Sequence, residues 1–212
     1  MQKYIIPIFV PHFGCPHRCV FCDQAKISGH KNLPNVSDTI EEYLSYFKDK
    51  KLPIEVAFYG GSFTAIKYET QKFLLEQVLP YINAGVVQSI RLSTRPDSIT
   101  NEILELLKEH HVQTIELGVQ SLDEEVLELS CRGHDRKSVF NSAKKIKEWG
   151  FMLGIQIMPG LPGDTFEKIY KTTLDVIKIK PDFVRIYPTV VIKGTALEEK
   201  FLKGKFKPLT LD

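Results

Sequence analysis

The apolar run Tyr4-Ile-Ile-Pro-Ile-Phe-Val10 leads directly into Pro11-His-Phe-Gly-Cys15-Pro-His-Arg-Cys19-Val-Phe-Cys22. Its Ile, Val, Phe and Tyr residues are typical of a strand that is buried on both faces of a parallel sheet. Ligands of such sheets bind beyond the carboxyl ends of the strands. The stretch therefore predicts a first strand with a cysteine-rich, metal-binding loop at its carboxyl end.

Five further runs of the same character follow along the chain. The expected strands are Ile54–Tyr59, Ser89–Thr94, Thr114–Val119, Phe151–Met158 and Phe183–Tyr187. The amphipathic stretches expected to be helical are Ser37–Asp49, Glu69–Ala84, Asn101–His110, Arg136–Trp149 and Thr165–Ile179, with a shorter helix over Asp123–Leu129. Ser37 and Thr100 are suitable N-caps, and Gly85 and Gly150 are stop signals. This alternation predicts an α/β fold with a parallel sheet, and its periodicity fits an open doubly wound sheet as well as a barrel or partial barrel.

Composition sets few limits on function. The chain has 212 residues, enough for one domain, and its net charge of +2 predicts no strong general attraction to nucleic acid or membrane. Five lysines gather near the end, and they form either a solvated face or an edge that contacts phosphates: Lys193, Lys200, Lys203, Lys205 and Lys207. The apolar run at Tyr4–Val10 is too short to cross a bilayer. We expect a cytoplasmic protein with reduced thiols.

The C-x3-C-x2-C spacing of Cys15, Cys19 and Cys22 is the strongest signal in the chain. Three thiolates in one loop suit three corners of a [4Fe–4S] cluster and leave the fourth iron open to a small molecule. Cys131 is remote and is expected to be a small packed residue. Two alternatives remain open, namely structural zinc on the three cysteines plus His12 or His17, and a chance grouping.

This loop, with Phe21 before its last cysteine, resembles the defining motif of the radical S-adenosylmethionine (SAM) superfamily. The resemblance implies a TIM-like, partial (β/α)6 barrel in which the open iron chelates SAM. It also implies that an electron from the cluster cleaves SAM and that a 5′-deoxyadenosyl radical then abstracts hydrogen from a substrate. A reducing electron donor of the flavodoxin or ferredoxin type is implied as partner.

Further segments resemble the SAM-binding elements of this superfamily. Gly60-Gly61-Ser62 looks like the element that takes the SAM amino group, although a tight turn explains the same glycines. Ser93 stands where related enzymes contact the ribose. The segment Ser93-Thr-Arg-Pro-Asp97 resembles an element of the superfamily, but Arg95 and Asp97 could equally form a salt bridge at a helix entry.

Three more candidate SAM ligands follow from the resemblance. Gln120 matches a residue that binds the SAM sugar, and Arg132 matches one that reaches its carboxylate, to which a guanidinium is well suited. Gln156 stands in the element near adenine and ribose. His134 is expected to be a loop residue, with a substrate or proton-transfer role as the alternative.

The segments 186–197 and 204–209 narrow the comparison. They resemble the part that follows the sixth strand in the Elongator catalytic subunit, a tRNA wobble-uridine enzyme whose likeness extends over nearly the whole chain; the middle of the chain also resembles oxygen-independent coproporphyrinogen oxidases. The first cysteine gap is shorter than in the Elongator enzyme, and the 212 residues include no acetyltransferase segment. The resemblance therefore implies a radical SAM core, expected to be C-terminally truncated, with tRNA or another nucleic acid as a possible partner.

Overall fold

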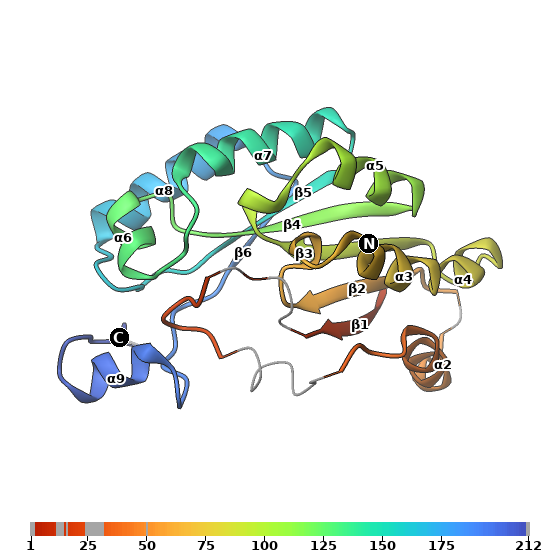
Figure 1. Ribbon diagram of the computed structural model, residues 1–212, viewed down its shortest axis with the longest axis horizontal. Helices are drawn as coiled ribbons and strands as arrows, with labels where there is room; N and C mark the ends of the chain where they lie inside the picture. Colours follow the sequence, from red (N-terminus) through yellow and green to blue (C-terminus); the bar gives the residue numbers. More distant parts are fainter. Residues whose placement is uncertain (1–2, 12–14, 16, 24–31, 50, 211–212) are drawn as a thin grey trace.

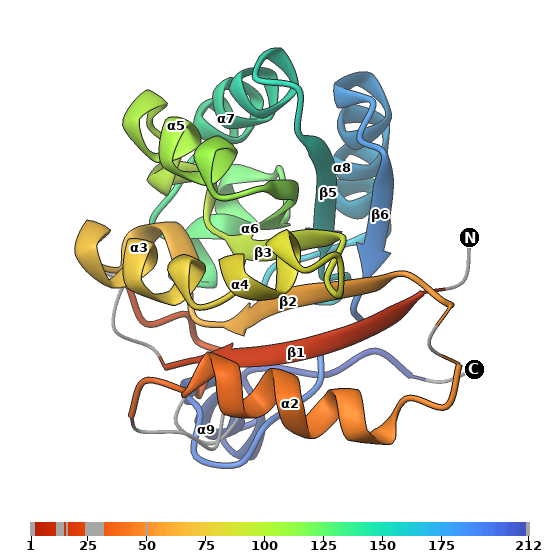
Figure 2. The same ribbon diagram turned by 90° about the vertical axis from the view of Figure 1, so that its right-hand side faces the viewer.

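The computed structural model describes residues 3–11, 15, 17–23, 32–49 and 51–210. Six strands form one parallel sheet in the order β1-β2-β3-β4-β5-β6, and within the described residues no pairing joins β6 to β1. Their bounds are β1 Tyr4–Val10, β2 Ile54–Gly60, β3 Ser89–Thr94, β4 Val112–Gln120, β5 Met152–Ile157 and β6 Phe183–Ile186. The sheet is curled, with β1 and β6 as its free edges (Figure 2). The structure confirms the predicted partial barrel.

Helices cover the outside of the curled sheet (Figures 1 and 2). They are α2 Val36–Tyr46, α3 Tyr68–Glu76, α4 Leu79–Asn83, α5 Asn101–Glu109, α6 Glu124–Leu129, α7 Arg136–Glu148 and α8 Phe166–Ile179. The last helix, α9 Ala196–Leu202, lies apart from this layer, beyond the carboxyl ends of the strands (Figure 1). Two short 3₁₀ turns, Phe63–Ala65 and Pro96–Ser98, follow β2 and β3. The space between sheet and helices is filled by one apolar core in which Ile115 and Leu117 of β4 are fully buried.

Three details of the sequence prediction are wrong. The helix expected over Glu69–Ala84 is two helices, because Pro80 stands in the first turn of α4 and a proline ring cannot continue a helix through that point. Helix α2 is capped by Asn35, whose side chain accepts from the Asp38 amide, and Ser37 lies inside the helix. Helix α9 was not predicted, although Thr195 caps it by accepting from the Glu198 amide. The N-cap at Thr100 is confirmed by its bond from the Ile103 amide.

Charged side chains, rather than aliphatic ones alone, link the strands on the inside of the barrel. Glu55 of β2 binds Arg91 of β3 at 2.5 Å, and Arg91 binds Glu116 of β4 at 2.8 Å. Arg185 of β6 reaches Glu116 at 3.3 Å and stacks over the ring of Tyr59 in β2 at 5.6 Å. Burial raises the pKa of Glu55, but Lys3 and Arg91 outweigh it, so that its pKa is lowered and the carboxylate stays charged. The pairs through Arg91 link neighbouring strands, and the pair between Arg185 and Glu116 joins β6 to β4, which are not neighbours in the sheet.

In the part of the chain that the structure describes, no helix combines the length and the apolar character needed to cross a bilayer.

Candidate functional site

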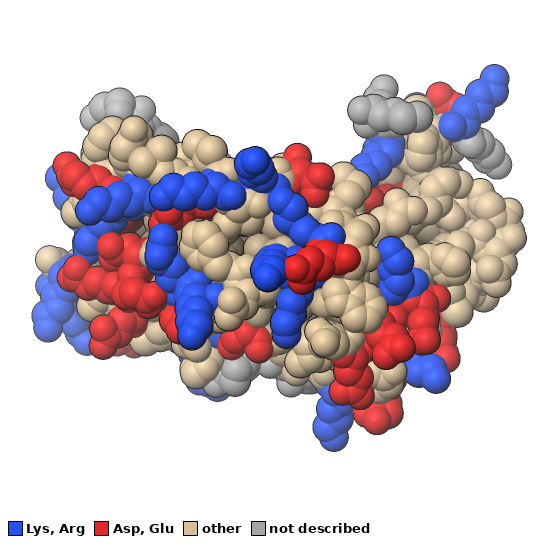
Figure 3. Space-filling view, turned by 90° about the horizontal axis from the view of Figure 1, so that it is seen from above, with Lys and Arg blue, Asp and Glu red and all other residues tan. Residues whose placement is uncertain are grey.

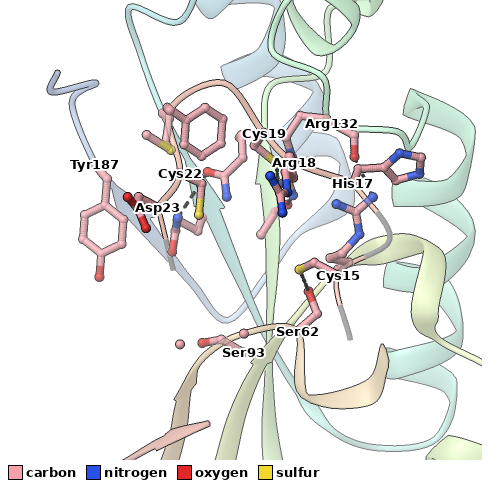
Figure 4. Close-up of a pocket in the computed structure, with 18 of the residues that line it drawn as sticks. Cys15, His17, Arg18, Cys19, Cys22, Asp23, Ser62, Ser93, Arg132 and Tyr187 are labelled. Carbon is pink, nitrogen blue, oxygen red and sulfur yellow. Dashed lines mark hydrogen bonds between the residues drawn. The ribbon is translucent and has the colours of Figure 1, made fainter. Parts of the chain in front are cut away.

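One cavity of about 740 Å³ lies at the carboxyl ends of the strands (Figure 4). Its volume is within the range of about 300–1,000 Å³ usual for small-molecule sites. Every site residue that the sequence predicted lines this cavity: Cys15, Cys19, Phe21, Cys22, Gly60, Gly61, Ser62, Ser93, Gln120, Arg132 and Gln156. The parallel sheet thus brings residues from four strand ends to the cysteine loop.

The cysteine loop is fixed by backbone hydrogen bonds on both sides. The Val20 amide donates to the Ser130 carbonyl at 3.1 Å, and the Val20 carbonyl accepts from the Leu197 amide of α9 at 2.8 Å. The ring of His17 lies against Gly133, where a Cβ atom would come within 2.1 Å of it. The loop is therefore held between the segment after α6 and the start of α9.

The three thiols have different partners. Cys15 Sγ lies 3.2 Å from the Ser62 hydroxyl, and Cys19 Sγ accepts from Arg132 Nη1 at 3.2 Å. Cys22 lines the same cavity. Among the described residues, no three His, Cys, Asp or Glu side chains are close enough together to form a metal site.

The sequence offered three further candidate metal ligands, His12, His17 and Cys131, and the described residues show no metal site that any of them completes. His17 lines the cavity, whereas His12 lies outside the described residues. Cys131 is exposed, and it is not among the residues that line the cavity. The expectation that Cys131 packs in the interior is wrong, because its left-handed backbone, at a φ of 53°, turns it outward after α6.

Gly60 and Gly61 bring the backbone of β2 close to that of β1. Gly60 has a φ of 99°, and a Cβ atom there would lie 2.6 Å from the Val10 carbonyl oxygen. The Gly61 amide donates to that same oxygen at 3.0 Å. A turn thus accounts for Gly60, while both glycines also leave their backbone exposed to the cavity.

Gln120 ends β4 in a strained conformation. Its φ is 70°, a region that side chains other than glycine seldom adopt, and the register of β4 against β5 shifts between Gly118 and Gln120. Its side-chain oxygen accepts from Gln156 Nε2 at 3.2 Å. The bulge aims two paired amides into the cavity, and strain of this kind gathers at functional sites.

Two arginines are buried beneath the cysteine loop. Arg132 donates from Nη2 to the Gly118 carbonyl, and its own carbonyl accepts from Arg95 Nη2 at 2.5 Å. Arg95 also binds Asp97 at 2.9 Å, so that the helix-entry salt bridge, one of the two sequence interpretations, is present. Burial together with these two arginines lowers the pKa of the buried His134 to about 3. His134 is therefore neutral near pH 7.

The polar or charged residues that line the cavity without having been predicted as site residues include Arg18, Asp23, Glu116 and Tyr187. Tyr187 could have been found from its place at the end of the sixth strand. Glu116 could also have been identified from the sequence, because a carboxylate inside an otherwise apolar strand needs buried partners. Those partners are Arg91 and Arg185.

Comparison with known proteins places this site in a family. The model of the radical SAM superfamily matches residues 9–176, and that of the radical SAM C-terminal domain matches residues 181–212. A tRNA uridine(34) acetyltransferase of Methanocaldococcus infernus is 30% identical, over 96% of this chain and 46% of its own length. An uncharacterized protein of Methanocaldococcus jannaschii is also 30% identical, over 92% of this chain and 64% of its own. The chain thus spans less than two thirds of either relative.

Solved structures share the fold. The archaeal Elp3 of Methanocaldococcus infernus superposes with a TM-score of 0.77 at 23% identity, over 98% of this chain and 50% of its own. The coproporphyrinogen III oxidase HemN of Escherichia coli, a radical SAM enzyme, gives 0.67 at 18% identity, over 97% and 48%. At these identities the likeness concerns the fold, and it agrees with the partial barrel described above.

Proposed function

Because the chain belongs to the radical SAM superfamily, we propose that it holds a [4Fe–4S] cluster on Cys15, Cys19 and Cys22 and binds SAM beside it. The observation that carries this proposal is the single cavity shared by the three thiols and by the polar residues at the strand ends. When bound, these two cofactors supply one-electron cleavage of a sulfonium carbon–sulfur bond and hydrogen abstraction from a substrate.

The chain offers matching groups for the amino group, the sugar and the carboxylate of SAM. Backbone groups of Gly60 and Gly61 with the Ser62 hydroxyl are available to the amino group, since all three residues line the cavity. The paired amides of Gln120 and Gln156 are available to the sugar. Ser93 adds one hydroxyl from the end of β3.

Arg132 is available to the carboxylate group of SAM. Its Nε is buried without a hydrogen-bond partner among the described residues, and a buried unpaired donor is costly unless a ligand satisfies it. This donor fits the carboxylate that the resemblance to the superfamily implies. Phe21 adds an aromatic surface to the same cavity.

The segment after β6 forms the apolar wall of the cavity. Val190 and Ile192 line it, and Gly194 to Ala196 lead from it into α9. An apolar wall excludes water from a reactive site and so limits side reactions. We propose that this wall, together with Tyr187, borders the place of the substrate.

We predict that Gln120→Gly weakens SAM binding about two- to tenfold, the range expected for loss of one hydrogen bond. The free energy of unfolding should stay within about 1 kcal/mol of wild type, because glycine accepts a φ of 70° without strain. His111→Gly is the matched control, since His111 has a φ of 60° but is exposed at the end of α5. Calorimetric titration of SAM should separate the two variants, and equal affinities would remove Gln120 from the site.

The cluster itself is tested by replacing each cysteine with alanine and reconstituting the protein anaerobically. We expect Cys15→Ala, Cys19→Ala and Cys22→Ala to lose both the visible absorption of the cluster and the release of 5′-deoxyadenosine from SAM under reducing conditions. Cys131→Ala should keep both, because Cys131 is exposed and does not line the cavity. Zinc without sulfide in the wild type, or loss of the cluster in Cys131→Ala, would contradict the proposal.

The second candidate function names a substrate for the first: a radical SAM enzyme that acts on tRNA. It is favoured by the name of the relative from Methanocaldococcus infernus and by exposed lysines just beyond the cavity wall, Lys203, Lys205 and Lys207. The face over α5, α7 and α8 is a poorer candidate, because Lys and Arg alternate there with Asp and Glu (Figure 3). Binding of tRNA should weaken steeply as salt rises. Absent binding, or binding insensitive to salt, would rule this candidate out.

A further inference from the structure

The guanidinium of Arg132 donates hydrogen bonds to two different protein groups. Nη1 donates to Cys19 Sγ at 3.2 Å, and Nη2 donates to the carbonyl of Gly118. Both Arg132 and Cys19 are buried, at 6% and 8% exposure. The guanidinium is therefore bonded directly to one of the three loop thiols.

The backbone around Arg132 fixes this arrangement. Its amide donates to the Leu127 carbonyl at 3.0 Å, and its carbonyl is held by Arg95. The carbonyl of Gly118 in β4 accepts from Nη2 and so ties the guanidinium to the sheet. The position of the guanidinium beside Cys19 thus depends on groups of the fold rather than on SAM.

We propose that Arg132 donates an N–H···S hydrogen bond to the Cys19 thiolate of the bound cluster and thereby raises the reduction potential of the cluster. This inference rests on the function proposed above. Reduction adds one electron, supplied by a one-electron reductant such as a flavodoxin-like protein, and the added negative charge is shared by the cluster sulfurs. A cationic donor at a cysteine sulfur stabilises this reduced state, and hydrogen bonds to sulfur are a recognised control of cluster potentials.

Arg132 differs from the other groups around the loop because it is a buried cation bonded to a thiol. Arg95 is buried as well, but its donors bind Asp97 and the Arg132 carbonyl. The Ser62 hydroxyl near Cys15 is uncharged. Arg18 carries a charge and lines the cavity, but it is exposed, so that water and salt screen it. A buried guanidinium keeps its effect in the less polar interior. Arg132 is accordingly assigned as a positioning residue that acts on the cluster through Cys19.

The test compares cluster potentials in the absence of SAM, so that any loss of SAM contacts has no influence. Wild type, Arg132→Met, Arg132→Lys and Arg18→Met are reconstituted as the full chain, and iron and sulfide are counted first. Midpoint potentials are then measured by dithionite titration with electron paramagnetic resonance. Arg18→Met is the matched control, because it also removes one positive charge from the cavity lining.

We expect a midpoint potential more negative than wild type in Arg132→Met, a smaller shift in Arg132→Lys, and nearly no shift in Arg18→Met. A wild-type potential in Arg132→Met, or an equal shift in Arg18→Met, overturns the inference. If Arg132→Met loses the cluster, Arg132→Lys decides, and a wild-type potential there overturns the inference as well. A wild type without iron and sulfide is a different outcome, since it refutes the proposed function itself.

Discussion

All six strands run in the same direction and pair in sequence order, and the site depends on this constraint. Parallel pairing puts every carboxyl end at the same edge of the sheet, so that residues far apart in the chain meet there. Cys15 and Gln156 are separated by most of the chain, yet they line one cavity. The buried ion pairs through Arg91 and Glu116 connect these strands on the inside of the barrel, and removal of one partner would leave an uncompensated buried charge.

The cysteine loop itself is not part of the sheet, and its position depends on two later segments. Val20 is bonded on one side to Ser130, and on the other to Leu197 in α9. Arg132, two residues after Ser130, bonds the Cys19 sulfur. The segment after α6 therefore both supports the loop backbone and places a cation at one of its thiols. This arrangement links the proposed SAM contact and the proposed cluster contact in a single side chain.

Most of the fold, and the meeting of the named residues in one cavity, could be predicted from the sequence, because both follow local patterns. The predicted bounds of β1 and β3 agree with the structure at both ends. The residues named at the carboxyl ends of the strands line one cavity, as expected for a parallel sheet. Contacts between distant segments could not be predicted in this way. Neither the bond from Arg132 to Cys19 nor the support of the loop by α9 has a signature in residue spacing. The left-handed conformation of Gln120 was also missed, since it arises from the register shift between β4 and β5 rather than from its residue type.

The central claim is that three cysteines hold the cluster and leave one iron for SAM. Mössbauer spectroscopy of the wild-type protein, reconstituted anaerobically with ⁵⁷Fe, tests this claim most directly. The account predicts the spectrum of a [4Fe–4S] cluster in which a single iron site changes its parameters when SAM is added. A spectrum that SAM leaves unchanged, or iron that never assembles into such a cluster, would contradict the account.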